Sequence, residues 1–159
     1  MKSLWILFSS LVFSICAWGQ QETLARFRIT EAKLGNTDAS QYYFNRKQYF
    51  AFYVNEDKEM MMANVSGNTD EQSYGRLYSM DMKEEEETDQ HYKTQTFSFR
   101  WNYHNNYDKE TGYASVALIK IYKPQGVIFV LRMVLPNLEV SEYKGYMEGT
   151  IDFKDYFKN

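Results

Sequence analysis

A strict alternation of aromatic and polar side chains between residues 92 and 104 constrains the fold of this chain more than any other feature. Phe97, Phe99, Trp101 and Tyr103 alternate with Ser98, Arg100, Asn102 and His104. Neighbouring side chains of a β-strand point to opposite faces, so four matches to a period of two predict a strand with one buried face. The alternation therefore predicts a protein built mainly from β-sheet.

Runs of the same kind recur along the chain. The expected strands are 25–34, 47–54, 59–66, 74–82, 92–104, 113–123, 127–135 and 141–153, with Tyr42-Tyr43-Phe44 as a further short one. Polar turn segments such as 55–58, 108–112 and 124–126 join consecutive strands. We expect a single antiparallel meander of about seven or eight strands. It closes into a small barrel or folds into a two-sheet sandwich, because both arrangements limit exposed strand edges.

Two of these strands have features that constrain their position. Residues 127–131 are apolar on both faces, which favours a strand at the centre of the fold or at an interface. In the last strand, Gly145 and Gly149 lie on one face, and glycines so placed predict a bend of the sheet, as at a barrel corner.

Residues 1–19 have the organisation of a cleavable signal peptide. Lys2 supplies the positive charge, residues 4–16 are mostly apolar, and Ala17-Trp18-Gly19 has the small-x-small pattern of a cleavage site. The apolar run is about 13 residues long, shorter than the ~20 that a membrane-spanning helix needs. We therefore expect an exported protein, in the periplasm, at the outer surface or outside the cell. Residues 20–159 form its single domain, with no membrane span after cleavage.

The only cysteine, Cys16, belongs to this segment. Lipidation of Cys16 is the alternative to its removal, but the bulky Ile15 stands where a lipidation site usually has a small residue. An exported domain without cysteines uses no disulfides, which favours a bacterial envelope over a eukaryotic secretory pathway.

The charge of residues 20–159 excludes some classes of partner. These 140 residues carry 17 basic and 21 acidic side chains, a formal charge of −4, because Lys2 is the only charged residue before them. The sequence has no basic patch suited to a phosphate backbone and no polybasic cluster for anionic lipids. We expect no nucleic-acid partner.

Motifs for catalysis, metals and nucleotides are missing from the sequence. It contains no G-x-S-x-G, no G-x-G-x-x-G and no P-loop. His91 and His104 are not at metal-ligand spacing, and the acidic run 84–87 is typical of a solvated loop or strand end. We therefore predict no catalytic residue, metal or cofactor. A carboxylate-dependent hydrolase stays as a third functional hypothesis, because only the fold can bring two carboxylates together.

The segment around residues 100–108 is the best candidate for a ligand site. It combines aromatic faces with amide and imidazole groups, in Trp101, Asn102, Tyr103, His104, Asn105 and Tyr107. The alternative is structural: Trp101 and Tyr103 continue the buried face of the strand and the asparagines form the next turn. Asn105, Asn106, Asp108 and Glu110 also offer oxygens to Ca²⁺, without the spacing of an EF-hand loop.

The methionines give a second ambiguous pattern. They line an adaptable apolar cavity in one interpretation and fill gaps in the core in the other. The residues concerned are Met60, Met61, Met62, Met80, Met82, Met133 and Met147.

As an exported β-meander rich in aromatic residues, the chain resembles small lipocalin-like barrels. The resemblance is architectural: the G-x-W motif of lipocalins is missing, and the first strand reads Arg26-Phe27-Arg28-Ile29. It implies a closed barrel and assigns no site residue. The first functional hypothesis is a non-enzymatic protein that binds a small apolar or aromatic ligand or a glycan. The second is an envelope protein that docks a protein partner through an aromatic surface.

Overall fold

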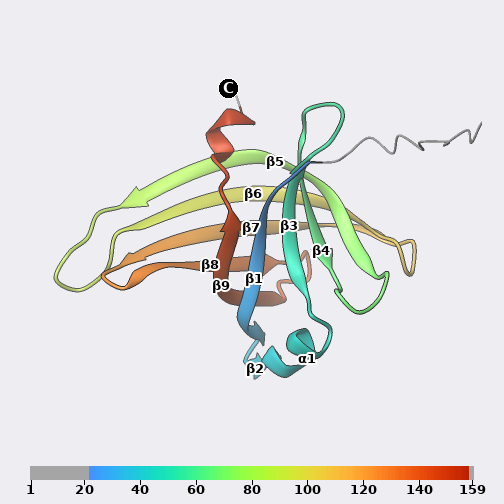
Figure 1. Cartoon of the computed structure of the whole chain (residues 1–159), viewed down its shortest axis with the longest axis horizontal. Coiled ribbons are helices and arrows are strands. Elements are labelled where there is room, and N and C mark those ends of the chain that lie inside the picture. The colour runs from blue at the N-terminus through green and yellow to red at the C-terminus, as the bar shows by residue number, and fades with distance from the viewer. Residues whose placement is uncertain (1–21, 158–159) are drawn as a thin grey trace, which may run out of the picture.

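The computed structural model describes residues 22–157, so the predicted signal peptide, residues 1–19 with Cys16, lies outside the described residues (Figure 1). The strands are β1 (Glu22–Leu34), β2 (Thr37–Asp38), β3 (Tyr49–Val54), β4 (Met60–Val65), β5 (Gln72–Glu85), β6 (Thr94–Asn105), β7 (Thr111–Lys123), β8 (Gly126–Val134) and β9 (Val140–Gly149). A short helix, α1 (Ser40–Asn45), lies between β2 and β3, and a 3-10 helix, η1 (Phe153–Asp155), follows β9.

Eight of the strands form a closed antiparallel barrel. Their order is β1-β3-β4-β5-β6-β7-β8-β9, and β9 pairs with β1 to close the ring, while β2 forms a short hairpin with β1. The closing seam runs from Ala25 opposite Gly149 to Leu34 opposite Ser141. The predicted meander is confirmed as a barrel, the architecture that the resemblance implied, and the sandwich alternative is excluded.

Close backbone contact at the closing seam requires glycine. A Cβ atom on Gly145 would lie 1.8 Å from the carbonyl oxygen of Arg28 on β1. Gly149 has a φ of +89°, and a Cβ there would lie 2.5 Å from the carbonyl oxygen of Leu24. The predicted bend at these two glycines is therefore present, and it lets β9 approach β1 closely enough to close the barrel.

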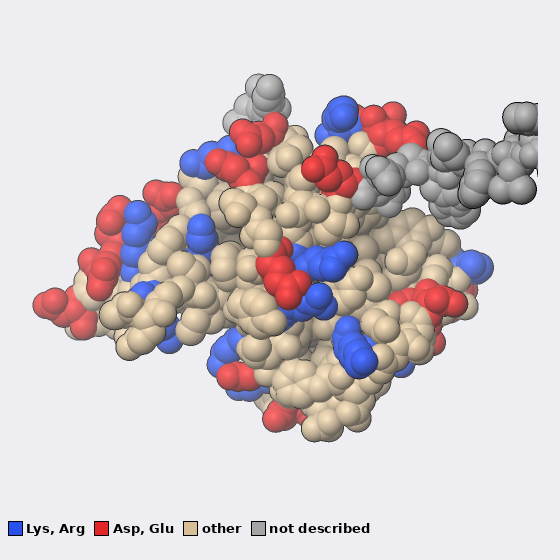
Figure 2. All heavy atoms as spheres, viewed as in Figure 1, with Lys and Arg blue, Asp and Glu red and all other residues tan. Residues whose placement is uncertain are grey.

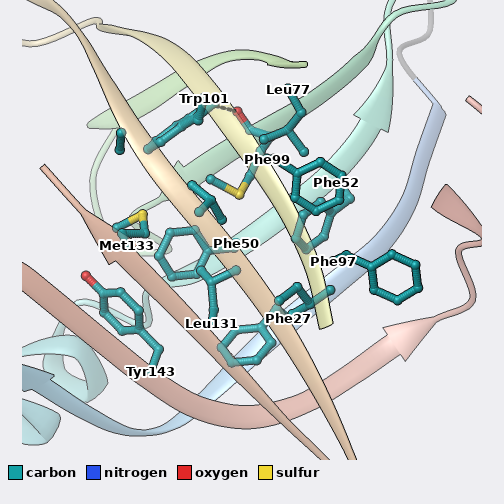
Figure 3. Close-up of a cluster of buried hydrophobic side chains, with 14 of the residues drawn as sticks. Phe27, Phe50, Phe52, Leu77, Phe97, Phe99, Trp101, Leu131, Met133 and Tyr143 are labelled. Carbon is teal, nitrogen blue, oxygen red and sulfur yellow. Dashed lines mark hydrogen bonds between the residues drawn. The ribbon is translucent and has the colours of Figure 1, made fainter. Parts of the chain in front are cut away.

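Side chains fill the middle of the barrel. The inward-facing residues of the strands form one cluster, in which Phe27, Phe50, Phe52, Met62, Leu77 and Leu131 are almost completely buried (Figure 3). Burial of each such side chain contributes about 1.5–3 kcal/mol. Because this interior is packed, a ligand inside the barrel has to lie at one of its ends.

Helix α1 closes one end of the barrel. Its Tyr43 is buried, and the Tyr43 hydroxyl lies 2.9 Å from the hydroxyl of Tyr143 on β9. The Tyr143 ring packs edge-on against both Tyr43 and Phe50, at centroid distances of 5.1 and 5.0 Å. This segment corrects one prediction: Tyr42-Tyr43-Phe44 forms part of a helix, because the burial of Tyr43 outweighs the β-propensity of three consecutive aromatic residues.

The other end of the barrel is asymmetric because the strands differ in length. β3 and β4 have six residues each, whereas β5, β6 and β7 have 12 to 14. β4 pairs with β5 only as far as Arg76, and β9 pairs with β8 only from Phe129 onward. The far ends of β5 to β8 therefore extend past their neighbours, as the left side of Figure 1 shows.

The chain after β9 crosses this second end. The predicted last strand, 141–153, is too long: β9 ends at Gly149, and the segment 150–157 turns over the barrel. Phe153 is buried against Phe52, Phe97 and Phe99, with ring centroids 4.9–5.5 Å apart.

Within residues 22–157, no helix has the length and apolar character needed to cross a membrane.

Candidate functional site

A cavity of about 460 Å³ lies at the end of the barrel that segment 150–157 crosses. We call it the barrel-mouth cavity. Its walls come from the extended parts of β6, β7 and β8, from the end of β9, and from residues 150–154. The apolar residues that line it are Phe97, Leu118, Val127, Phe129, Met147, Ile151 and Phe153.

The cavity exists because strands β6 to β8 continue where β9 stops. Inward-facing side chains on these strands have no strand opposite them, and the 3-10 helix η1 covers them only in part. Asp152 fixes the start of that helix, because its side chain accepts a hydrogen bond from the backbone N–H of Lys154 at 3.0 Å. The helix thereby holds Phe153 as the floor of the cavity.

Polar groups line the barrel-mouth cavity both on the strands, at Gln95 and Lys120, and on the C-terminal segment, at Thr150, Asp152 and Lys154. Gln95 and Lys120 lie opposite each other on β6 and β7, and both side chains are half-buried. The Nε2 atom of Gln95 donates a hydrogen bond to Oε1 of Glu84 at 2.7 Å. A mainly apolar pocket with a few polar groups is the usual composition of a small-molecule site.

Two of the predicted site residues, Trp101 and Tyr103, point into the barrel. Trp101 is buried, and its Nε1–H donates to the backbone oxygens of Met62 and Gly75, at 3.1 and 3.2 Å (Figure 3). The Tyr103 ring lies over Gly112 on β7, where a Cβ would come within 2.5 Å of the hydroxyl oxygen. Both residues continue the buried face of β6, as the structural alternative predicted.

Asn102 and His104 point to the opposite, outer face. They line an open hollow of about 560 Å³, together with Met61, Tyr74, Tyr103 and Tyr113. The Tyr78 hydroxyl donates to Oδ1 of Asn102 at 2.9 Å, and the His104 ring packs edge-on against Tyr74 at 5.7 Å. Three of the six predicted site residues, Asn102, Tyr103 and His104, therefore border this hollow, and the alternation separates Asn102 and His104 from Trp101.

The last two predicted site residues belong to the turn. Asn105 is buried, its Oδ1 accepts from Ser73 Oγ at 2.6 Å, and its Nδ2 donates to Asp108. Asn106 bonds to the backbone of Gln72, and Asp108 accepts from the N–H of Glu110. Tyr107 is exposed. The structure therefore does not gather the six residues into one cavity, and a ligand at this segment stays a prediction.

Comparisons with protein-family models, with curated proteins and with solved structures find no match to this chain.

The acidic residues of the described chain give no sign of catalytic chemistry. Ser66 and Asn105 are the buried polar residues of that part, and no Asp or Glu joins them. Hydrogen bonds from Ser40 lower the pKa of Asp38, and a hydrogen bond from Lys83 lowers that of Glu85. A general acid needs a raised pKa, so neither residue supports the hydrolase hypothesis. Residues 22–157 contain no cluster of three or more His, Cys, Asp or Glu suited to a metal.

The methionines divide between core and cavity. Met60, Met62 and Met133 are buried, and Met80 and Met82 pack against the core from partly exposed positions. Met147 lines the barrel-mouth cavity, and Met61 lies in the outer hollow. Core filling therefore describes most of the group, and the cavity interpretation applies to Met147.

The large exposed aromatic side chains come from separate elements. Tyr42 and Phe44 belong to α1, Tyr146 to β9, Tyr113 to β7, and Tyr107 to the β6–β7 turn. Phe44 and Tyr146 line one shallow hollow together, with Arg28 and Lys47. The hypothesis of a protein-docking surface stays a prediction.

Sequence reasoning missed the barrel-mouth cavity, although most of its residues lay in predicted strands. One signal was available: Lys120 interrupts the inward-facing apolar positions of β7, after Val116 and Leu118. A lysine on a buried face indicates that the face opens to solvent at that point.

Proposed function

We propose that this protein is an exported, non-enzymatic binding protein that holds a small apolar or aromatic ligand in the barrel-mouth cavity. The observation that carries the proposal is the cavity itself, which is lined mainly by apolar side chains. Its volume of about 460 Å³ falls in the range of roughly 300–1,000 Å³ that is common for ligand pockets. The packed interior of the barrel supports this position over one deeper inside.

Saturable binding of the neutral apolar dye phenylnaphthylamine to the purified protein tests the proposal. In Val127→Trp, the larger indole side chain occupies part of the cavity. We therefore expect at least a tenfold weaker affinity for the dye. Ile128→Trp is the matched control, since Ile128 is the next residue of β8 and points to the opposite face. Equal affinities in both variants and the wild type would exclude the cavity as the site.

Export is a separate part of the proposal, supported by the pattern of residues 1–19. Expression of the full chain in a Gram-negative host, followed by fractionation and mass analysis, tests it. We expect a secreted or periplasmic form that begins at Gln20. An intact form in the cytoplasm would contradict export without affecting the binding proposal.

A further inference from the structure

The inner surface of β5 to β8 changes from apolar to polar over one step along the strands. The inner row of cross-strand neighbours consists of Met82, Phe97, Leu118 and Leu131. The next row toward the strand ends, which we call the rim row, consists of Glu84, Gln95, Lys120 and Phe129. A ligand that lies along the strands therefore has its apolar part against the inner row and its other end at the rim row.

Lys120 is the cation of the rim row that faces the cavity. Its Nζ atom lies 5.1 Å from the ring centre of Tyr122 and 6.0 Å from that of Phe129. No ion pair and no hydrogen bond to this Nζ is formed by the described residues. The two aromatic rings hold the ammonium group at the mouth, where it is available to an anion.

The acidic groups around the mouth are already engaged or lie beyond it. Glu84 accepts the hydrogen bond from Gln95, and Asp152 accepts the backbone N–H of Lys154. Glu86, Glu87 and Asp89 are exposed in the β5–β6 connection, where water and salt screen their charge. Acidic side chains gather at the left end of the molecule in Figure 2, where Figure 1 shows this connection. Two further cations lie at the mouth: Lys154, which lines the cavity, and Lys93, 5.9 Å from the ring centre of Tyr122.

We propose that the barrel-mouth cavity takes an amphipathic anion, whose apolar part packs on Phe97, Leu118 and Phe129 and whose acidic head group pairs with Lys120. The head group is of the carboxylate type, because Lys120 is the only cation in the rim row, and its compact ammonium group pairs with one compact negative charge. This inference rests on the proposed binding function and specifies its ligand class.

Calorimetric titration of the purified protein at neutral pH with dodecanoate, dodecanol and dodecylamine tests the inference, with the two charged compounds below their critical micelle concentrations and dodecanol below its solubility limit. We expect dodecanoate to bind about tenfold more tightly than dodecanol, which matches one charge-assisted hydrogen bond, and dodecylamine to bind most weakly. Vesicles of neutral phospholipid that contain dodecanoate distinguish the free anion from one held in a membrane: we expect no protein on the vesicles.

The variant Lys120→Met keeps the length and apolar stem of the side chain but removes its charge. We expect it to lower dodecanoate affinity about tenfold and to leave dodecanol affinity unchanged. Lys123→Met is the matched control, because it removes the same charge from the same strand on the opposite face.

The outcomes separate the two proposals. Equal binding of dodecanoate and dodecanol, with no effect of Lys120→Met, would overturn the head-group inference and leave the proposed function standing. Binding of none of the three compounds would overturn the proposed function. If Lys120→Met does not fold, the ratio of the dodecanoate and dodecanol affinities of the wild-type protein decides the inference.

Discussion

The two ends of this barrel are built from the same alternating strands, yet one is sealed and the other contains a cavity. At the α1 end, the helix places Tyr43 inside the barrel, and the Tyr43 hydroxyl lies 2.9 Å from the Tyr143 hydroxyl. At the opposite end, η1 places Phe153 against three rings of the core, but β6 to β8 continue past it and leave about 460 Å³ of space.

The difference shows how strand length, rather than residue type, creates a site in a small barrel. The α1 end is closed because α1 packs against β1 and its Tyr43 packs on Tyr143 of β9. The mouth is open because β5 to β7 have about twice as many residues as β3 and β4. Stability should therefore depend most on the sealed end, and binding on the mouth.

Tyr143→Ala should cause the largest effect, a loss of about 3–5 kcal/mol in the free energy of unfolding, because a buried aromatic ring at the sealed end is removed. Urea denaturation measures it. Tyr143→Phe is the control: it keeps the ring and leaves the Tyr43 hydroxyl unpaired, at a cost of about 1–2 kcal/mol. A loss below about 1 kcal/mol for the alanine variant would contradict the sealed-end model.

Phe153→Ala should have the next largest effect. We expect a loss of about 3 kcal/mol in the free energy of unfolding, because the ring packs on Phe52, Phe97 and Phe99. The same denaturation assay measures it. Lys154→Ala changes an exposed neighbour and should stay within about 0.5 kcal/mol. Equal free energies of unfolding for the two variants would show that segment 150–157 does not cover this end of the barrel.

High pH should weaken the sealed end selectively. Burial raises the pKa of the Tyr43 and Tyr143 phenols above the usual value near 10. The unfolded chain therefore loses these protons first, so the folded state is fully stabilised below pH ~10 and loses stability as the pH rises further. Each phenol contributes up to about 1.4 kcal/mol per pH unit.

Unfolding titrations between pH 8 and 11 check this slope, with the Tyr43→Phe/Tyr143→Phe protein as reference. The double variant should lose stability less steeply than the wild type. Part of the slope should persist, because burial also raises the pKa of Tyr53 and Tyr103. Identical slopes for the two proteins would place the pH sensitivity outside the sealed end.

Asn102→Ala should have the smallest effect, below about 0.5 kcal/mol, because its bond from Tyr78 is exposed to water. The affinity for phenylnaphthylamine should also be unchanged, since Asn102 lies in the outer hollow and not at the mouth. A tenfold loss of dye affinity in this variant would move the ligand site to the outer face of β6.

The strands were predictable because alternation is a local property of the chain. The period of two in 92–104 identified β6 and correctly placed Phe97, Phe99, Trp101 and Tyr103 on one buried face. Polar turn residues likewise predicted the β7–β8 hairpin. The helical state of Tyr42-Tyr43-Phe44 was not predictable, because it depends on the contact of Tyr43 with Tyr143, 100 residues away.

The candidate site was less predictable than the fold. Trp101, Asn102 and Asn105 are close in the sequence, but alternation places Trp101 inside the barrel and Asn102 on its outer face, and Asn105 is bound to Ser73 and Asp108 where β6 ends. The residues at the mouth come from β6 to β9 and the C-terminal segment, and no local pattern connects them.

By itself, the sequence determined an all-β meander, its order of strands, and the glycines at the closing seam. The reason is that side-chain alternation, turn residues and the backbone freedom of glycine are properties of short segments. Tertiary structure decided that β1 and β9 meet, that α1 seals one end, and that the chain after Gly149 crosses the other. These outcomes depend on the register and relative length of strands distant in the chain, which fix where packed side chains end and empty space begins.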